Sequence, residues 1–322
     1  MRAPSYDDLL AARQLLAPTP IRQTPVHTSR TLGEAAGVDD LRLKLELFQV
    51  TGSFKPRGAY NRIASLTPEE RARGVITVSA GNHAQAVAYA AALAGTSSVV
   101  VTWKTASKLK LDAAQAYGAE TLRLGDTPLE AFEAMFGVRD ERGLVLIHPF
   151  DDPLVLAGQG TLGLELVDDV PDVGTVVIPI GGGGLIGGVA IALRHLRPGV
   201  RIVGVEPEGA PTLTRALQAG APVPLDDVST IADGLSAPFA GALTYELVRD
   251  LVDDVVLVTD AEILSAMRLL ALRAKVVAEP AAAAGLAALV AGRVAPASGP
   301  VVVVVSGGNV AAEMIASAVS AE

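Results

Sequence analysis

Short apolar, β-branched runs alternate along the chain with longer stretches rich in Ala and Leu. This alternation is typical of repeated β–α units that build a parallel sheet. The run of five valines before Ser306 is apolar at every position, as expected of a strand that is buried on both faces. The predicted strands are Val75–Val78, Ser98–Thr102, Thr121–Leu124, Leu144–Ile147, Thr175–Ile180, Ile202–Glu206, Asp254–Val258 and Val301–Val305. The predicted helices include Asn82–Leu93, Ser107–Tyr117, Leu185–Leu196, Ala261–Ala274, Ala281–Val290 and Val310–Ser320.

Two regions are rich in Gly, Pro and Asp, and we expect them to be mostly loop: residues 137–153 and 207–241. The second of these regions is also expected to shape the substrate end of any site. A fixed-period repeat, a low-complexity tract and a long linker are all absent from the sequence. The pattern as a whole predicts an α/β protein with open, mostly parallel sheets flanked by helices.

Composition narrows the class of protein. A chain of 322 residues is long enough for two domains, and 50% hydrophobic residues with only 4% aromatic ones suit close helix–sheet packing. The net charge of −9 argues against a nucleic-acid or anionic-membrane partner. Cysteine is absent, which excludes disulfides and thiolate chemistry. The start of the chain lacks the pattern of a signal peptide, and the apolar runs are too short to cross a bilayer, so we expect a cytoplasmic protein.

Lys55 is the strongest candidate for a reactive side chain. It lies among small and apolar residues in the segment Thr51–Ala59. The chain has six lysines and twenty arginines, so an amine at this position departs from the general preference for arginine. An amine can lose its proton when it is desolvated and can then form a Schiff base, which a guanidinium cannot do. The alternative is an ordinary surface lysine in front of a helix.

Four consecutive glycines, Gly181 to Gly184, follow a predicted strand and precede Leu185 at the start of a helix. Glycine allows a backbone to turn with positive φ and to approach a ligand closely, and successive N–H groups at a helix start bind an anion such as phosphate. Three readings remain open. One is a phosphate site, one is a Rossmann dinucleotide site through Gly187 and an acidic Glu206, and one is close packing alone.

Two further segments follow strands. Ser79 and Asn82 belong to Ser79–Gln85, which would offer a pocket for a carboxylate or phosphate, or would simply cap the next helix. Ser306 begins Ser306–Asn309, which is otherwise a turn into the last helix. The four histidines are scattered and show no metal-ligand spacing. Since ligands bind at the carboxyl ends of parallel strands, we expect all four segments on one rim, where an amine and a phosphate site would suit pyridoxal 5′-phosphate (PLP).

The sequence resembles the fold type II PLP enzymes, specifically the serine/threonine dehydratase (threonine ammonia-lyase) family. The resemblance rests on Ser53–Ala59, Ser79–Gln85, the glycine run and Ser306–Asn309, in this order and at the family's spacing. It implies a two-domain fold like that of the tryptophan synthase β subunit. The small domain would span 49–147, and 1–48 with 148–322 would form the large, PLP-binding domain. We also expect a homodimer or homotetramer that acts on a small amino-acid substrate.

The resemblance also implies roles for individual residues. Lys55 would hold PLP as a Schiff base and act as the base at the substrate α carbon, with Phe54 against one face of the cofactor ring. Asn82 would bind the ring 3′-oxygen. The remaining implied contacts are the cofactor phosphate at Gly181, Gly182, Gly183, Gly184 and Leu185, the pyridine nitrogen at Ser306, and the substrate carboxylate at Ser79, Asn82 and His83.

Two positions depart from related enzymes. Ala80 stands where the similar serine racemases have a serine that returns a proton to the α carbon, so racemisation is expected to be poor. The divalent-metal site of relatives would fall at Glu206, the Ala210 carbonyl and Thr212, where Thr212 replaces a carboxylate. A hydroxyl in place of that carboxylate weakens a Mg²⁺ or Ca²⁺ site, so no metal is expected.

The resemblance therefore implies a lyase that removes water and then ammonia from a β-hydroxy amino acid. The expected reactions convert L-threonine to 2-oxobutanoate and L-serine to pyruvate. The nearest alternative is a sibling lyase for 3-hydroxyaspartate or phenylserine, and an arginine near the substrate side chain would favour the former. A β-replacing synthase and an NAD-binding oxidoreductase built on Gly182, Gly184 and Gly187 are less favoured, since the latter leaves Lys55 unexplained.

Overall fold

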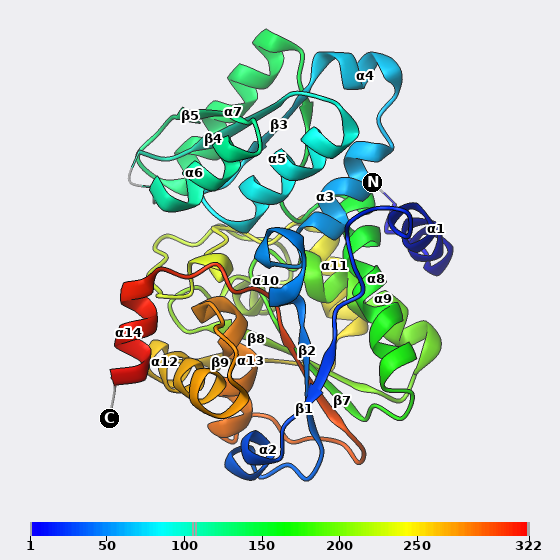
Figure 1. Cartoon of the computed structure of the whole chain (residues 1–322), viewed down its shortest axis with the longest axis vertical. Helices are drawn as coiled ribbons and strands as arrows, with labels where there is room; N and C mark the ends of the chain where they lie inside the picture. Colours follow the sequence, from blue (N-terminus) through cyan, green and yellow to red (C-terminus); the bar gives the residue numbers. More distant parts are fainter. Residues whose placement is uncertain (1, 105, 107, 321–322) are drawn as a thin grey trace.

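The computed structural model describes residues 2–104, 106 and 108–320, which form two sheets with helices packed around them (Figure 1). The larger sheet has six strands in the order β1-β2-β10-β7-β8-β9. Only β1 runs antiparallel to its neighbour. The strands of this sheet are β1 Val26–Thr28, β2 Leu41–Leu45, β7 Thr175–Pro179, β8 Arg201–Pro207, β9 Asp254–Val258 and β10 Val301–Val305.

The smaller sheet is fully parallel and has the order β5-β4-β3-β6. Its strands are β3 Val75–Val78, β4 Ser98–Thr102, β5 Glu120–Arg123 and β6 Val145–Leu146. Figure 1 shows this sheet with its helices above the larger sheet. All four strands come from residues 75–146, although the domain boundaries at 49 and 147 stay a prediction.

Helices cover both sheets. Around the smaller one lie α4 Pro68–Arg73, α5 Asn82–Ala94, α6 Lys108–Ala116 and α7 Pro128–Arg142, and α3 Pro56–Ala64 leads into it. The other α-helices are α1 Tyr6–Leu16, α2 Arg30–Ala36, α8 Pro153–Asp169, α9 Gly184–Leu196, α10 Thr212–Ala219, α11 Ala242–Leu251, α12 Asp260–Leu269, α13 Pro280–Val290 and α14 Ala312–Ser320. Short 3₁₀ turns span Glu46–Phe48, Val50–Gly52 and Asp233–Leu235, and a π-helical turn spans Leu270–Ala274. No helix in the described part of the chain is long and apolar enough to cross a membrane.

The strand β10 shows why the valine run is apolar throughout. Val301, Val303 and Val305 pack into one hydrophobic cluster with α12 and α13. Val302 and Val304 pack into a second cluster with α8 and α9 on the opposite face. Because successive side chains of a strand point to opposite faces, a strand covered on both sides needs apolar residues at every position.

The predicted fold class is confirmed, and four strands (β3, β4, β9 and β10) have the predicted bounds. The short strands β1 and β2 were not predicted. The expectation of loop for 137–153 was wrong at its start, because α7 continues to Arg142 and ends at Gly143 with φ +65°. Residues 207–241 are mostly loop, as expected, but they include α10. Ser107, the predicted first residue of a helix, lies outside the described residues, and α6 begins at Lys108.

Candidate active site

A pocket lies where the carboxyl ends of three strands from both sheets meet. Ser79 follows β3, the glycine run follows β7, and Ser306 follows β10. The cavity has a volume of about 200 Å³. It is lined by every cofactor and substrate residue predicted from the sequence: Phe54, Lys55, Ser79, Asn82, His83, Gly181 to Gly184, Leu185 and Ser306. The structure therefore brings the four segments together, as their positions after strands indicated.

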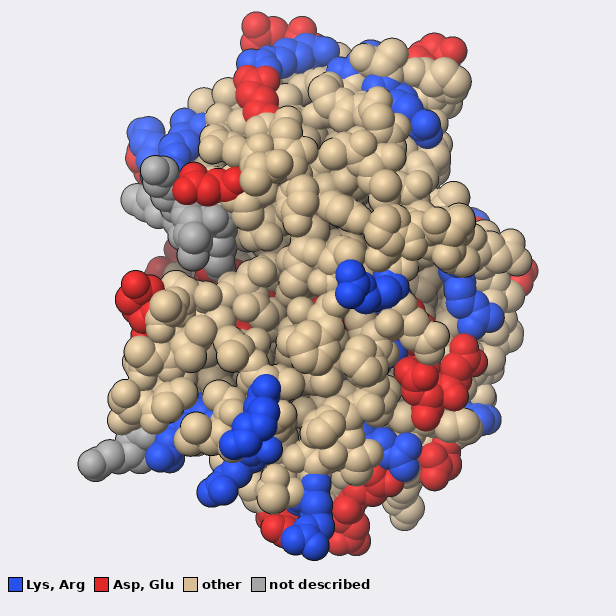
Figure 2. All heavy atoms as spheres, viewed as in Figure 1, with Lys and Arg blue, Asp and Glu red and all other residues tan. Residues whose placement is uncertain are grey.

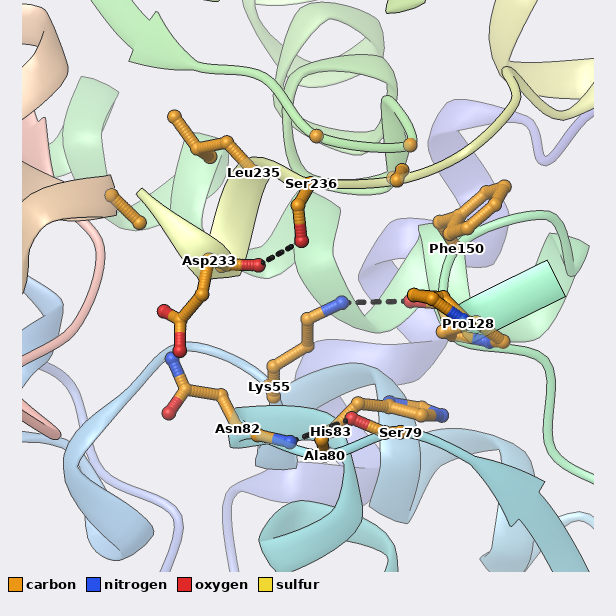
Figure 3. Close-up of a pocket in the computed structure, with 18 of the residues that line it drawn as sticks. Lys55, Ser79, Ala80, Asn82, His83, Pro128, Phe150, Asp233, Leu235 and Ser236 are labelled. Atoms are coloured by element: carbon orange, nitrogen blue, oxygen red, sulfur yellow. Dashed lines mark hydrogen bonds between the residues drawn. The ribbon is translucent and has the colours of Figure 1, made fainter. Parts of the chain in front are cut away.

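Lys55 projects into this pocket from the turn in front of α3. Figure 3 shows it beside Asn82 and facing the loop that carries Leu235 and Ser236. Its Nζ donates a hydrogen bond to the Pro149 carbonyl over 2.8 Å and lies 5.2 Å from the centre of the Phe54 ring. Burial lowers the pKa of the Lys55 amine to about 8, although the Glu279 carboxylate partly opposes the shift. An ordinary surface lysine is excluded, because this amine lines a pocket and loses its proton far more readily than a solvated one.

The glycine run forms a close-fitting loop at the start of α9. Gly183 has φ +88°, and a side chain at Gly182 would place its Cβ 2.3 Å from the Phe150 ring. At Gly184 the added Cβ would lie 3.0 Å from Phe150 Cα. The Gly182 carbonyl is fixed by the Thr244 hydroxyl, which donates to it over 2.8 Å. Backbone N–H groups here are free of side chains and lie at the positive end of a helix, which suits a phosphate.

The segment after β3 is more than a helix cap. The helix α5 begins at Asn82, and its N-cap position is Gly81, which has no side chain to cap the helix. The Ser79 hydroxyl accepts a hydrogen bond from the Gly81 N–H over 3.1 Å. Asn82 instead uses its amide in contacts with Asn309 and Glu279. The side chains of Ser79 and Asn82 are therefore held at the pocket wall.

Two buried histidines stand near Lys55. His83 is 3% exposed, and its Nε2 lies 3.1 Å from the Ile147 carbonyl. Burial is the main cause that keeps the pKa of His83 well below its usual range, and the charge of Lys55 adds to the effect. The same two causes lower the pKa of His148 to about 4, and its Nδ1 accepts from the Asp151 N–H over 2.8 Å. Both rings are neutral near pH 7, so neither competes with Lys55 for a proton.

Ser306 closes the pocket at the end of β10. It is 4% exposed, and its carbonyl accepts a hydrogen bond from the Phe54 N–H over 3.1 Å. An isolated bridge between Ser53 and Gly307 continues this pairing. The last strand is thus joined directly to the turn that carries Lys55.

The sequence did not single out an aromatic wall on the pocket. Phe132 of α7 and Phe150 both contact Phe239, with ring centres 5.2 and 5.8 Å apart. Trp103 and Pro128 also line the cavity. Phe239 lies in 207–241, which was expected to shape the substrate end. The sequence analysis did not predict helix α7, so nothing in it placed Phe132 near the pocket.

The metal candidates Glu206, Ala210 and Thr212 do not line this pocket. Both carboxylate oxygens of Glu206 accept hydrogen bonds at the start of α10, from the Leu213 N–H over 2.6 Å and from the Thr214 N–H over 2.9 Å. The Thr212 hydroxyl donates to the Ala237 carbonyl, and the Ala210 carbonyl accepts from the Thr212 N–H. Within residues 2–104, 106 and 108–320, no group of three acidic, His or Cys side chains is arranged to hold a metal ion. The absence of a metal stays a prediction.

The residues of the pocket fit PLP. A side-chain-free loop at a helix start can hold a phosphate, an amine with a lowered pKa can form the Schiff base, and a buried hydroxyl can face a ring nitrogen. The family model for the pyridoxal-phosphate dependent enzymes matches residues 18–307. The chain belongs to this family. Its cofactor is PLP, as predicted, and the alternative of an NAD-binding oxidoreductase is wrong.

Relatives of this PLP enzyme are lyases by name. The chain is 42% identical to an L-threonine ammonia-lyase of Thermotoga maritima, over 97% of this chain and 77% of the relative. It is 41% identical to a catabolic L-threonine dehydratase of Staphylococcus aureus, over 95% of this chain and 89% of that one. The predicted class, a lyase of the ammonia-lyase type, is confirmed.

Solved structures extend the similarity to the whole fold. Maize serine racemase superposes with a TM-score of 0.93 at 39% identity, covering 98% of this chain and 96% of that one. A threonine deaminase from T.th. superposes with a TM-score of 0.89 at 41% identity, covering 96% of this chain and 99% of that one. The fold type II assignment is therefore confirmed.

Proposed function

We propose that this PLP lyase acts on L-threonine, which it converts to 2-oxobutanoate and ammonia, and also on L-serine, which it converts to pyruvate. The observation that carries the proposal is the amine of Lys55, whose pKa is lowered to about 8 in a pocket that also contains the glycine loop. The names of the relatives support threonine as the substrate. When bound, the cofactor supplies the electron sink for the negative charge that develops at the substrate α carbon.

The described side chains divide the remaining work. Lys55 Nζ would hold the cofactor and later take the proton from the α carbon. The bond between the β carbon and its hydroxyl would then break, and the hydroxyl would take up a proton and leave as water. The N–H groups from Gly181 to Leu185 would bind the phosphate, and Phe54 would pack against the ring. Ser79, His83 and the backbone N–H of Asn82 at the start of α5 would bind the substrate carboxylate. The released enamine hydrolyses in water to the 2-oxo acid and ammonia.

Ser306 limits how strongly charge is drawn into the cofactor ring. A hydroxyl is neutral, so it does not hold a proton on the pyridine nitrogen as a carboxylate would. Elimination relieves the negative charge by expelling the β-hydroxyl and therefore needs a weaker sink than transamination. The burial of Ser306 beside Phe54 supports this role.

Ala80 disfavours racemisation. It lines the pocket with a methyl group, which has no proton to return to the α carbon. We expect Ala80→Ser to raise the rate at which L-serine becomes D-serine while pyruvate formation continues. A chiral chromatographic assay with the parent enzyme as the matched control measures both products, and no rise in D-serine would contradict the role of Ala80.

A second candidate substrate, phenylserine, is favoured by the aromatic wall. Phe132, Phe150 and Phe239 offer apolar surface to a large side chain. The described residues that line the pocket include no arginine, so nothing comparable favours the second carboxylate of 3-hydroxyaspartate.

The test is 2-oxo acid release from L-threonine, L-serine, threo-3-hydroxyaspartate and phenylserine with PLP supplied. Threonine turnover above the others supports the proposal, and phenylserine above threonine makes the second candidate the substrate. Silence on all four, with the cofactor bound, would overturn elimination and favour a β-replacing synthase.

We also propose a cytoplasmic homodimer or homotetramer. Figure 2 shows that charged side chains gather at the upper and lower ends of one face, while its middle is mostly uncharged. Phe48 and Val277 are 48% and 46% exposed, more than the other large apolar side chains of the described residues, and could contact another subunit. The acidic composition without cysteine supports the compartment. Light scattering on the purified protein measures the number of subunits, and a monomer would contradict the proposal.

A further inference from the structure

A series of hydrogen bonds through the amides of Asn82 and Asn309 joins four segments that are distant in the sequence. Asn309 Nδ2 donates to the Thr51 carbonyl over 2.7 Å and to Asn82 Oδ1 over 2.8 Å. Asn82 Nδ2 in turn donates to Glu279 Oε1 over 2.6 Å. These hydrogen bonds therefore link the turn before Lys55, the segment after β10, the start of α5 and the start of α13.

Only one orientation of the two amides satisfies these contacts. A carboxylate and a backbone carbonyl can only accept hydrogen bonds, so Glu279 and Thr51 require N–H groups from their partners. Rotating the Asn309 amide by 180° would place its oxygen against two acceptors. Rotating the Asn82 amide would place its oxygen against Glu279 and its nitrogen against the Asn309 NH₂ group. The contacts thus decide which atom of Asn82 is the donor.

Two glycines make room for this arrangement, one directly before the Ser53–Ala59 motif and one within Ser306–Asn309. A Cβ at Gly52 would lie 2.6 Å from Asn309 Oδ1, and a Cβ at Gly307 would lie 2.3 Å from Glu279 Oε1. Thr51 adopts φ +63°, a left-handed conformation that is costly for a β-branched residue. The local backbone is therefore shaped so that the two amides fit, which indicates more than an incidental contact.

We propose that Asn309 and Glu279 are positioning residues that hold Asn82 with an N–H group directed at the ring oxygen of PLP. The proposal rests on the proposed function only in assigning Asn82 to that oxygen. Asn82 Nδ2 has two hydrogens, and Glu279 takes one of them. Asn82 lines the pocket, and the proposal assigns the other hydrogen to a bond with the cofactor there. A donor at this position stabilises the anionic form of the ring oxygen over the neutral hydroxyl.

The test uses the absorption of the bound cofactor in the full-length protein, without substrate. The anionic ring oxygen gives the visible band and the neutral hydroxyl gives a near-ultraviolet band, so the ratio of the bands reports the balance between them. Asn309→Asp keeps the size of the side chain but removes both N–H groups and sets a carboxylate against Asn82 Oδ1. We expect the ratio to fall about tenfold, which corresponds to about 1.4 kcal/mol. An unchanged ratio would overturn the proposal.

Two further variants separate positioning from a general structural role. Asn309→Ser removes the amide without adding charge, so it provides the measurement if Asn309→Asp does not fold, and we expect it to lower the ratio several-fold. Asn61→Asp makes the same chemical change at an amide that donates to the Leu154 carbonyl over 2.7 Å, outside the pocket lining. It should lower the melting temperature but leave the ratio unchanged.

A double variant tests whether Asn309 acts through Asn82. In an Asn82→Ala background, adding Asn309→Asp should leave the ratio as it is, because the donor is already gone. A further tenfold fall in that background would overturn the proposal. Failure of the proposed function can be distinguished from failure of this proposal. A parent enzyme that shows the visible band but releases no 2-oxo acid would contradict the lyase assignment. The ratio of the bands in the Asn309 variants would still test the positioning role.

Discussion

Lys55 and Arg57 are two residues apart in one turn, yet their surroundings are opposite. Arg57 is 2% exposed and is held by two carboxylates, with its Nε 2.8 Å from Glu46 and its Nη1 2.6 Å from Glu165. These two carboxylates outweigh the effect of burial, so the pKa of Arg57 is raised. Lys55 donates instead to a neutral carbonyl, that of Pro149, and its pKa falls to about 8.

The difference shows how one segment holds a structural cation and a reactive one. Burial alone disfavours a charge, so a cation that must stay charged needs carboxylate partners, as Arg57 has. An amine that must lose its proton needs burial without direct pairing. Glu279 acts on Lys55 only at longer range, which tempers the shift without cancelling it.

The largest effect on activity is expected when Lys55 is replaced by arginine, the residue type found at position 57. Lys55→Arg keeps the positive charge but cannot be deprotonated or form a Schiff base. Turnover of L-threonine should fall by at least about 10³-fold, and the visible band of the bound cofactor should disappear. Circular dichroism checks that the fold is retained. A variant that kept the visible band would show that another amine holds the cofactor.

The next largest effect concerns Arg57 and is on stability. Arg57→Met leaves the buried carboxylates of Glu46 and Glu165 without their cation, and the free energy of unfolding should fall by about 3–5 kcal/mol. Urea unfolding followed by circular dichroism measures it. Adding Glu46→Gln removes one of the two stranded charges and should recover part of the loss. If Arg57→Met alone were as stable as the parent, the ion pairs of Arg57 would not be what stabilises this turn.

A moderate effect is expected from pH on the amine of Lys55. PLP reacts with the neutral form, which increases as the pH rises through a pKa of about 8. The rate at which the cofactor-free enzyme takes up PLP should increase about fivefold between pH 7 and 8. Glu279→Gln removes the charge that opposes the shift, so its midpoint should move to lower pH. Stopped-flow absorbance measures both rates, and a midpoint near 10.5 in the parent would contradict the burial argument.

The smallest effect is expected at an exposed ion pair. Lys104 and Asp126 approach to 2.9 Å, but their side chains are 61% and 68% exposed. Water and salt screen such a pair, so Asp126→Asn should change the free energy of unfolding by less than about 0.5 kcal/mol. The same urea assay measures this change. The Lys104–Asp126 pair serves as the exposed counterpart of the buried ion pairs of Arg57. A loss comparable to that of Arg57→Met would mean that burial is not what separates the two pairs.

The sequence predicted the rim of the pocket because each of its segments directly follows or flanks a strand. Parallel strands bring their carboxyl ends to one edge, so Ser79, Gly181 and Ser306 could be placed together without coordinates. The partners of Arg57 could not be predicted. Glu46 and Glu165 are 11 and 108 residues from it. Glu165 meets Arg57 through the packing of α3 on α8, and Glu46 meets it from the 3₁₀ turn after β2.

Predictions from local composition were wrong where tertiary packing determines burial and secondary structure. The strand β2 reads Leu-Arg-Leu-Lys-Leu, which looks half-exposed, yet Lys44 is fully buried because Asp169 and Glu165 lie 2.9 and 3.0 Å from its amine. Residues 137–142 belong to a region whose Gly, Pro and Asp content predicts loop, but they form the end of α7. Phe132 and Phe239 reach the pocket from different layers, and neither belongs to a motif with a fixed spacing.

The position of β10 sets the order in which the enzyme can be assembled during synthesis. This strand lies between β2 and β7, and it pairs Val301 with Leu41, 260 positions earlier in the chain. The smaller sheet needs only residues 75–146 and can form early, whereas the larger one must wait for nearly the whole polypeptide. Ser306 arrives with that final strand. An interrupted translation product would therefore carry Lys55 without the completed pocket whose burial lowers the pKa of its amine.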